Sequence, residues 1–262
     1  MTKTELFRSL HHGDRPLVLP NAWDYGSAAM LAEAGFPALG TTSLGVAAAA
    51  GLPDGTAATR AETLTLAQRL GRLTIPVTVD IEGGFSTDPR EVAEFCAELA
   101  HAGIAGINLE DSRSNAALAD PREQGELIAA VKARVPELFV NARTDTYWLG
   151  IDTDSTLERV QHYEKCGADG IFVPGITDAE GIRALATALS APLNILFSPT
   201  GPTVAELGEL GVRRISTGSL LYRAALAAAV HTAESVAHGH PLVAEIPSYA
   251  TIQRVLEPWP PR

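Results

Sequence analysis

Residues 77–85 read VTVDIEGGF, and the fold prediction starts from the pattern in this short stretch. Its first part, Val77–Ile81, is almost continuously apolar, which is typical of a parallel strand buried on both faces. Asp80 and Glu82 are two positions apart, so in a strand both carboxylates point the same way. An apolar strand that ends in carboxylates predicts a buried sheet with a chemically active edge.

Seven further runs repeat this pattern and bring the number of predicted strands to eight: Leu17–Pro20, Ala38–Thr42, Gly106–Leu109, Leu138–Ala142, Gly170–Val173, Leu193–Phe197 and Arg214–Thr217. Amphipathic helical stretches such as Pro89–Ala102 lie between them, and several end in glycine, which suits a helix C-cap. The length of 262 residues is close to the roughly 250 of one α/β barrel. We therefore predict a single (β/α)8 TIM-barrel domain over residues 1–262.

The composition argues against several classes of protein. The formal net charge is −11, and no basic stripe is present, so we expect no nucleic-acid partner. No run approaches the roughly 20 apolar residues of a membrane span, so we expect no membrane partner. The two cysteines, Cys96 and Cys166, cannot form a disulfide framework, and a cytoplasmic location fits this.

Acidic residues follow the predicted strands at the end where such barrels have their active sites. Unpaired carboxylates that meet there would repel one another and raise each other's pKa values, and a hard dication removes this problem. We predict that Asp80, Glu82 and Glu110 hold Mg2+, with Mn2+ as the alternative metal. For Asp24 and Asp111 the structural alternative is a helix N-cap.

Further polar residues at this end are candidates for binding a substrate. Arg143 follows the fifth run and suits bidentate capture of a carboxylate or phosphoryl group, with a structural ion pair as its alternative role. The turn of Thr42, Ser43 and Leu44 could present backbone N–H groups to an anionic oxygen, and Asn194 lies in the seventh run. No histidine ends a strand, so the sequence supports neither a Ser-His-Asp arrangement nor a histidine-rich zinc site.

At these residues the chain resembles the isocitrate lyase/phosphoenolpyruvate mutase superfamily over most of its length. The motifs that carry the resemblance are Pro20-Asn21-Ala22-Trp23-Asp24, residues 40–45 (GTTSLG) with 51–55 (GLPDG), 79–85 (VDIEGGF), 108–111 (NLED) and 141–145 (NARTD).

The resemblance implies a Mg2+-dependent enzyme that acts on a 2-oxo or 2-hydroxy acid. It implies that Asp80, Glu82 and Glu110 hold the metal, mostly through water, and that Asp54 lies near metal and substrate. Thr42, Ser43 and Leu44 would bind the oxo-acid end, and Arg143 the departing group. It also implies a homodimer or homotetramer in which the last barrel helix, within a C-terminal segment from about residue 219 to 262, is exchanged between subunits.

The loop after Asp111 departs from the family pattern. It lacks the cysteine and histidine of the family's C–C lyases, and Ser112 stands where the mutases have lysine, while Asn115 is a candidate for the asparagine of their gating loop. Our leading hypothesis is a Mg2+-dependent lyase that cleaves a C–C bond beside a 2-oxo or 2-hydroxy acid through an enolate, with Asp54, Arg143 and Glu110 as catalytic residues. The alternatives are P–C bond chemistry, as in a phosphonomutase or phosphonopyruvate hydrolase, and a non-catalytic barrel that binds an oxo acid.

Overall fold

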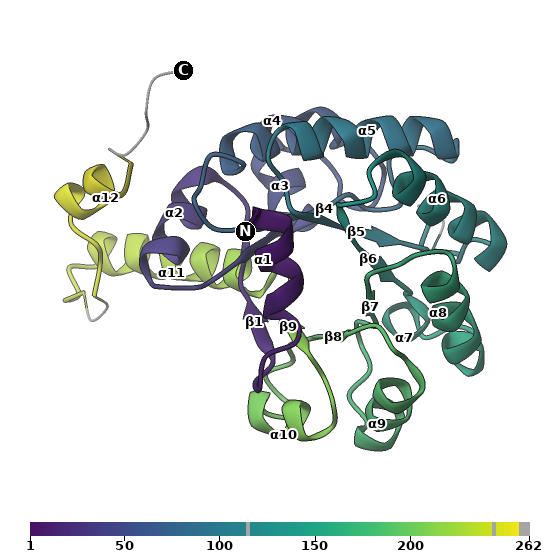
Figure 1. Cartoon of the computed structure of the whole chain (residues 1–262). Helices are drawn as coiled ribbons and strands as arrows, with labels where there is room; N and C mark the ends of the chain where they lie inside the picture. Colours follow the sequence, from purple (N-terminus) through teal and green to yellow (C-terminus); the bar gives the residue numbers. More distant parts are fainter. Residues whose placement is uncertain (114–115, 243–244, 257–262) are drawn as a thin grey trace.

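The computed structural model describes residues 1–113, 116–242 and 245–256 and consists of one parallel β-barrel surrounded by helices (Figure 1). Its strands are β1 (Leu17–Leu19), β2 (Asn21–Ala22), β3 (Leu39–Thr41), β4 (Val77–Asp80), β5 (Gly106–Glu110), β6 (Phe139–Arg143), β7 (Gly170–Phe172), β8 (Leu193–Leu196) and β9 (Arg214–Ser216). All the pairings between these strands are parallel, and each of the eight predicted runs overlaps one of the eight longer strands, with β5 and β6 each one residue longer at the C-terminal end than predicted. The predicted TIM barrel is therefore confirmed.

Strand β1 pairs with β9 and strand β2 pairs with β3, so this one stretch of chain joins the two edges of the sheet. Only Pro20 separates the two strands. Proline has no N–H to donate to a ladder, which explains why the regular pairing stops here. The Pro20 carbonyl still accepts from Gly40 N at 2.9 Å. Together β1 and β2 occupy one of eight positions and close the barrel.

Several of the helices that surround the barrel are followed by a glycine, as predicted. The surrounding helices are α2 (Tyr25–Glu33), α3 (Ser43–Ala50), α4 (Arg60–Leu70), α5 (Pro89–His101), α6 (Pro121–Arg134), α7 (Thr146–Leu149), α8 (Thr156–Lys165), α9 (Ala179–Ala188) and α10 (Val204–Glu209), with a short 3-10 helix at Thr153–Ser155. Asp88 caps α5 by accepting from Arg90 N at 2.8 Å. Gly103 and Gly167 follow their helices with positive φ angles, as the glycine pattern predicts.

Helix α1 (Lys3–Leu10) covers the N-terminal end of the barrel. Its Phe7 packs edge-on against Phe139 at the start of β6, and the two belong to a buried cluster with residues that precede or begin other strands. The ring of His11 stacks on Phe139 and closes the same end. With this end filled, the C-terminal end of the barrel is the one left open for a site.

Helix α11 (Leu220–Ala237) extends outward from the barrel, and α12 (Tyr249–Leu256) packs against α2, where Arg254 Nη1 lies 2.6 Å from Glu33 Oε1 (Figure 1). Only Tyr222 and Ser235 of α11 are buried, while Leu226, Val230 and Val236 are 50%, 59% and 65% exposed. None of the described helices combines the length and the apolar character that crossing a membrane requires.

Candidate active site

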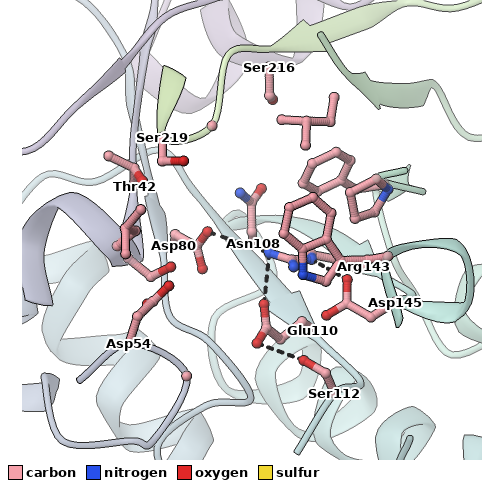
Figure 2. A pocket seen from close by; sticks show the side chains of 18 of the residues that line it. Thr42, Asp54, Asp80, Asn108, Glu110, Ser112, Arg143, Asp145, Ser216 and Ser219 are labelled. Atoms are coloured by element: carbon pink, nitrogen blue, oxygen red, sulfur yellow. Dashed lines mark hydrogen bonds and ion pairs between the residues drawn. The ribbon is translucent and has the colours of Figure 1, made fainter. Parts of the chain in front are cut away.

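A pocket of about 360 Å³ opens at the C-terminal ends of the strands (Figure 2). One half is polar and comes from the segments that follow β3, β4 and β5, with Thr42, Ser43, Asp54, Asp80 and Glu110. The other half follows β6, β7 and β8 and is largely apolar. The predicted location of the site at this end of the barrel is therefore where the structure has a cavity.

Asp80 and Glu110 line the pocket on neighbouring strands, with Arg143 between them. Arg143 Nη1 lies 2.8 Å from Glu110 Oε2 and 4.0 Å from Asp80 Oδ2, and Arg143 Nε lies 2.6 Å from Asp145 Oδ1. Burial raises the pKa of Asp80 to about 6 and that of Glu110 to about 8, although the Arg143 guanidinium opposes both shifts. Burial lowers the pKa of Arg143, but its three acidic partners raise it above the usual value. Near neutral pH Glu110 therefore keeps its proton unless more positive charge is supplied, whereas Asp80 is mostly ionised.

Glu82 lies outside this pocket, in a neighbouring cavity of about 170 Å³ that Glu110 also lines. Its Oε1 accepts from Thr59 Oγ1 at 2.7 Å and its Oε2 from Ala57 N at 2.9 Å, while its own N–H donates to Asp80 Oδ1 at 3.1 Å. The backbone of Glu82 is left-handed, with φ of 50°. At this turn the chain leaves the strand conformation, so the alternation that predicted a common direction for Asp80 and Glu82 no longer applies.

The segment that follows β3 provides the opposite wall. Thr42 is the N-cap of α3, and Thr42, Ser43 and Leu44 all line the pocket. The first N–H groups of a helix have no acceptor within it, so this turn can offer donors to an anionic oxygen. Asp54 is exposed at the pocket's edge, on the loop that Glu82 holds through Ala57 and Thr59.

Asn194, predicted to bind substrate, lies below the pocket instead of lining it. It is fully buried, and its Nδ2 donates to Ser216 Oγ at 3.1 Å, which places the lining residue Ser216. Beside it the buried Arg214 donates through Nη2 to Asn108 Oδ1 at 3.0 Å, and burial lowers the pKa of Arg214 to about 9. The sequence reasoning did not single out Arg214, although a charged residue within an apolar run was the available signal.

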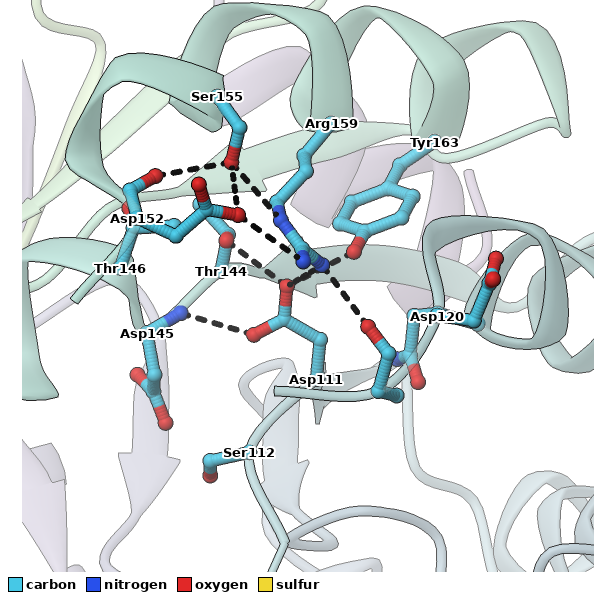
Figure 3. A network of polar contacts seen from close by, with 12 residues as sticks. Asp111, Ser112, Asp120, Thr144, Asp145, Thr146, Asp152, Ser155, Arg159 and Tyr163 are labelled. Carbon is cyan, nitrogen blue, oxygen red and sulfur yellow. Dashed lines mark hydrogen bonds and ion pairs between the residues drawn. The ribbon is translucent and has the colours of Figure 1, made fainter. Parts of the chain in front are cut away.

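Asp111 faces the outer helices and not the pocket (Figure 3). Its carboxylate accepts from Asp145 N at 2.9 Å, Thr144 Oγ1 at 2.8 Å and Tyr163 Oη at 2.7 Å, and lies 3.5 Å from Arg159 Nη1. It is therefore not a helix N-cap. Asp24 is one, since it accepts from Ser27 N at 2.7 Å.

The loop after Asp111 adds Ser112, Arg113 and Ala116 to the lining, and none of the three was predicted to bind metal or substrate. Ser112 Oγ donates to Glu110 Oε1 at 2.8 Å. The apolar half of the pocket was also missed, because the prediction considered only polar residues at the strand ends. Asn115, the candidate gating-loop residue, is outside the described residues.

The residues present fit a dication bound partly through water. Among the described residues no three His, Cys, Asp or Glu side chains are grouped closely enough to hold a metal directly. Mg2+ is usually held by one or two carboxylates and keeps several waters, and Asp80 and Glu110 provide two carboxylates in one cavity. Asp145 adds a buried Oδ2 without a hydrogen-bond partner among the described residues.

Comparison with known proteins supports the resemblance seen in the motifs. The family model described as phosphoenolpyruvate phosphomutase matches residues 7–237. The protein of Mycobacterium tuberculosis named "Uncharacterized protein Rv1998c" is 47% identical over 94% of both chains. The oxaloacetate decarboxylase of Pseudomonas aeruginosa is 33% identical over 85% of this chain and 81% of its own. The crystal structure of 2,3-dimethylmalate lyase, a member of the phosphoenolpyruvate mutase/isocitrate lyase superfamily, is 26% identical, with a TM-score of 0.85 over 98% of this chain and 95% of its own.

Proposed function

Because this chain belongs to the phosphoenolpyruvate phosphomutase family, we propose that it is a Mg2+-dependent lyase that cleaves a C–C bond beside a 2-oxo or 2-hydroxy acid through an enolate. One observation carries the proposal: Asp80 and Glu110 share a cavity, with pKa values raised to about 6 and about 8. Perturbed carboxylates that converge in a cleft are typical of catalytic sites.

In this proposal Asp80 and Glu110 hold the metal, and Glu82 supports it from the adjacent cavity. When bound, Mg2+ supplies positive charge that favours an enolate over the intact oxo acid. Mn2+ prefers the same hard oxygen donors and could replace it. Glu82 would also hold the loop that carries Asp54, through its hydrogen bonds with Ala57 and Thr59.

The remaining residues bind and orient the acid. Ser43 and Leu44 line the pocket in the first turn of α3, where backbone N–H groups have no acceptor within the helix, and would bind the oxo-acid carboxylate with Thr42 beside them. Arg143 keeps Glu110 in place and faces the part of the substrate that departs. Asn194 contributes by positioning Ser216. Asp54 and Glu110 both line the pocket and are the groups proposed to move protons.

An EDTA-sensitive cleavage of a 2-oxo or 2-hydroxy acid would test the proposal. A panel should include oxaloacetate, which the name of one relative contains, and both mono- and dicarboxylic acids. We expect turnover with Mg2+ or Mn2+, its loss on chelation, and its loss in Asp80→Asn. Asp24→Asn, which changes an N-cap outside the pocket, is the matched control. Turnover that survives EDTA and the Asp80 substitution would contradict the proposal.

A second candidate is P–C bond chemistry, because the matching family model is the phosphomutase model. Phosphorus NMR on phosphonopyruvate and phosphoenolpyruvate separates the two activities, since P–C cleavage or rearrangement moves the phosphorus resonance. Ligand-induced stabilisation without turnover on either panel would instead support the non-catalytic oxo-acid-binding barrel.

We also propose a cytoplasmic homodimer or homotetramer in which α11 is exchanged between subunits. The exposed Leu226 and Val230 lie one helical turn apart on α11 and present apolar surface that a neighbouring barrel would cover. Light scattering after size exclusion tests the assembly. A change of both residues to glutamine should shift the protein to smaller species, and a native protein that is monomeric at micromolar concentration would exclude this assembly.

A further inference from the structure

The geometry points to a substrate whose far end is uncharged and apolar, bound against the half of the pocket that follows β6, β7 and β8. The inference rests on the proposed function and specifies its substrate class: a 2-oxo acid with one carboxylate and a branched alkyl or aryl group, in place of a dicarboxylic acid.

The apolar half is built from three consecutive strand ends. Two of its side chains lie on α7, one ends β7, one follows β7 and one ends β8: Trp148, Leu149, Phe172, Pro174 and Leu196. Phe172 is buried, whereas Trp148 is 56% exposed at the pocket. A large exposed aromatic side chain beside a cavity is typical of a binding surface, because it leaves apolar area in water until a ligand covers it.

None of these five residues of the apolar half is a cation that could receive a second carboxylate. The two cationic lining residues are Arg113 and Arg143. Arg143 forms ion pairs with Glu110 at 2.8 Å and Asp145 at 2.6 Å. Arg113 donates through Nη1 to Ser112 O at 3.0 Å and through Nη2 to Gln124 Oε1 at 3.2 Å. Arg113 lies on the loop after β5, on the polar side of the pocket, so a carboxylate bound at the apolar wall would lose its hydration without replacement.

The charges of the pocket favour the same conclusion. Four acidic residues, Asp54, Asp80, Glu110 and Asp145, face the two arginines in the lining. A dication balances that excess of negative charge. A substrate with one carboxylate then adds one negative charge to the pocket, whereas a dicarboxylate adds two. The ring of Phe172 lies 5.6 Å from the Arg143 guanidinium carbon and marks the boundary between the charged and apolar halves.

Two isosteric oxamates test this inference directly. N-oxalylglycine and N-isobutyloxamate share the two-oxygen head of oxalate and differ only in whether the tail ends in a carboxylate or an isopropyl group. Calorimetric titration with saturating Mg2+ measures their dissociation constants, with oxalate as the reference for the head. We expect N-isobutyloxamate to bind at least about ten-fold tighter than N-oxalylglycine, because its methyl groups are buried against the apolar wall.

Substitutions of the half-buried Leu149 supply the matched variants. Leu149→Arg should reverse the preference between the two oxamates, whereas Leu149→Gln, of similar size but uncharged, should only abolish it. Trp148→Ala should weaken the binding of N-isobutyloxamate by about three- to ten-fold and leave the binding of oxalate nearly unchanged.

The outcomes separate this inference from the proposed function. If oxalate binds with Mg2+ but N-oxalylglycine equals or exceeds N-isobutyloxamate, the apolar assignment is wrong and the lyase proposal stands. The same holds if N-isobutyloxamate does not bind at all. If oxalate binding shows no dependence on Mg2+, the proposed function fails, and the substrate class inferred from it fails as well.

Discussion

Glu110 and Asp111 are adjacent at the end of β5, yet their carboxylates belong to two different environments. Glu110 faces the pocket and has one cation and one hydroxyl within bonding distance, Arg143 and Ser112. Asp111 faces the outer helices, where three donors and Arg159 surround it. Both are nearly or fully buried, so burial alone does not separate a catalytic carboxylate from a structural one. The number of hydrogen-bond and ion-pair partners does separate them. A buried carboxylate with few partners costs free energy and is kept only where it has a function.

The largest expected effect comes from changing the pocket side of this pair. Glu110→Gln should lower turnover by about 10²- to 10⁴-fold, the range typical of a lost acid–base group, while the protein still folds. The activity panel described above measures turnover, and circular dichroism checks the fold. Ser112→Ala removes a hydroxyl that only supports Glu110 and should cost far less. Similar losses in both variants would mean that the carboxylate has no special role.

Asp111→Ala should show the opposite behaviour, with stability as the main loss. Removal of the carboxylate leaves Arg159 buried without this partner, and breaking a buried pair costs about 3–5 kcal/mol. Denaturant unfolding measures the change. As the control, Asp24→Ala removes an exposed N-cap and should cost only about 1 kcal/mol. If the two variants were equally destabilised, the network around Asp111 in Figure 3 would not be a major source of stability.

The contrast between these neighbours also shows what the sequence could predict. Apolar runs and helix-ending glycines determined the eight strand positions, because burial on both faces leaves a clear pattern in the sequence. The side on which a carboxylate lies was harder to predict. The positive φ of Glu82 turns it away from Asp80, and Asp111 looked like a possible cap until Thr144 and Tyr163 were seen around it. Such partners come from distant segments, and no local pattern reveals them.

Mg2+ binding should depend on pH through the pocket carboxylates and not through Asp111. The pKa values of Glu110 and Asp80 are raised to about 8 and about 6, so both must lose protons before they hold a cation. Affinity should therefore fall as pH decreases from 8 to 6, by up to about ten-fold per unit for each proton released. Titration in buffers of different ionisation enthalpy counts the protons. Glu110→Gln should reduce this number, and an unchanged number would assign the proton elsewhere.

The smallest effect concerns the stability of the metal-free protein. Glu110 keeps its proton up to about pH 8 when folded, whereas its usual pKa is 4.5, so the folded state binds the extra proton between these values. The contribution of Glu110 to stability is therefore highest below pH 4.5 and falls as pH rises toward 8. Glu110→Gln removes this loss, so the variant should gain stability relative to the unchanged protein at pH 8.5 compared with pH 5, and the raised pKa already includes the effect of Arg143. Thermal unfolding of both proteins in EDTA at the two pH values measures the difference. A relative gain at pH 5 instead of pH 8.5 would mean that Glu110 is ionised in the folded state, and the contrast with Asp111 would then have to rest on geometry alone.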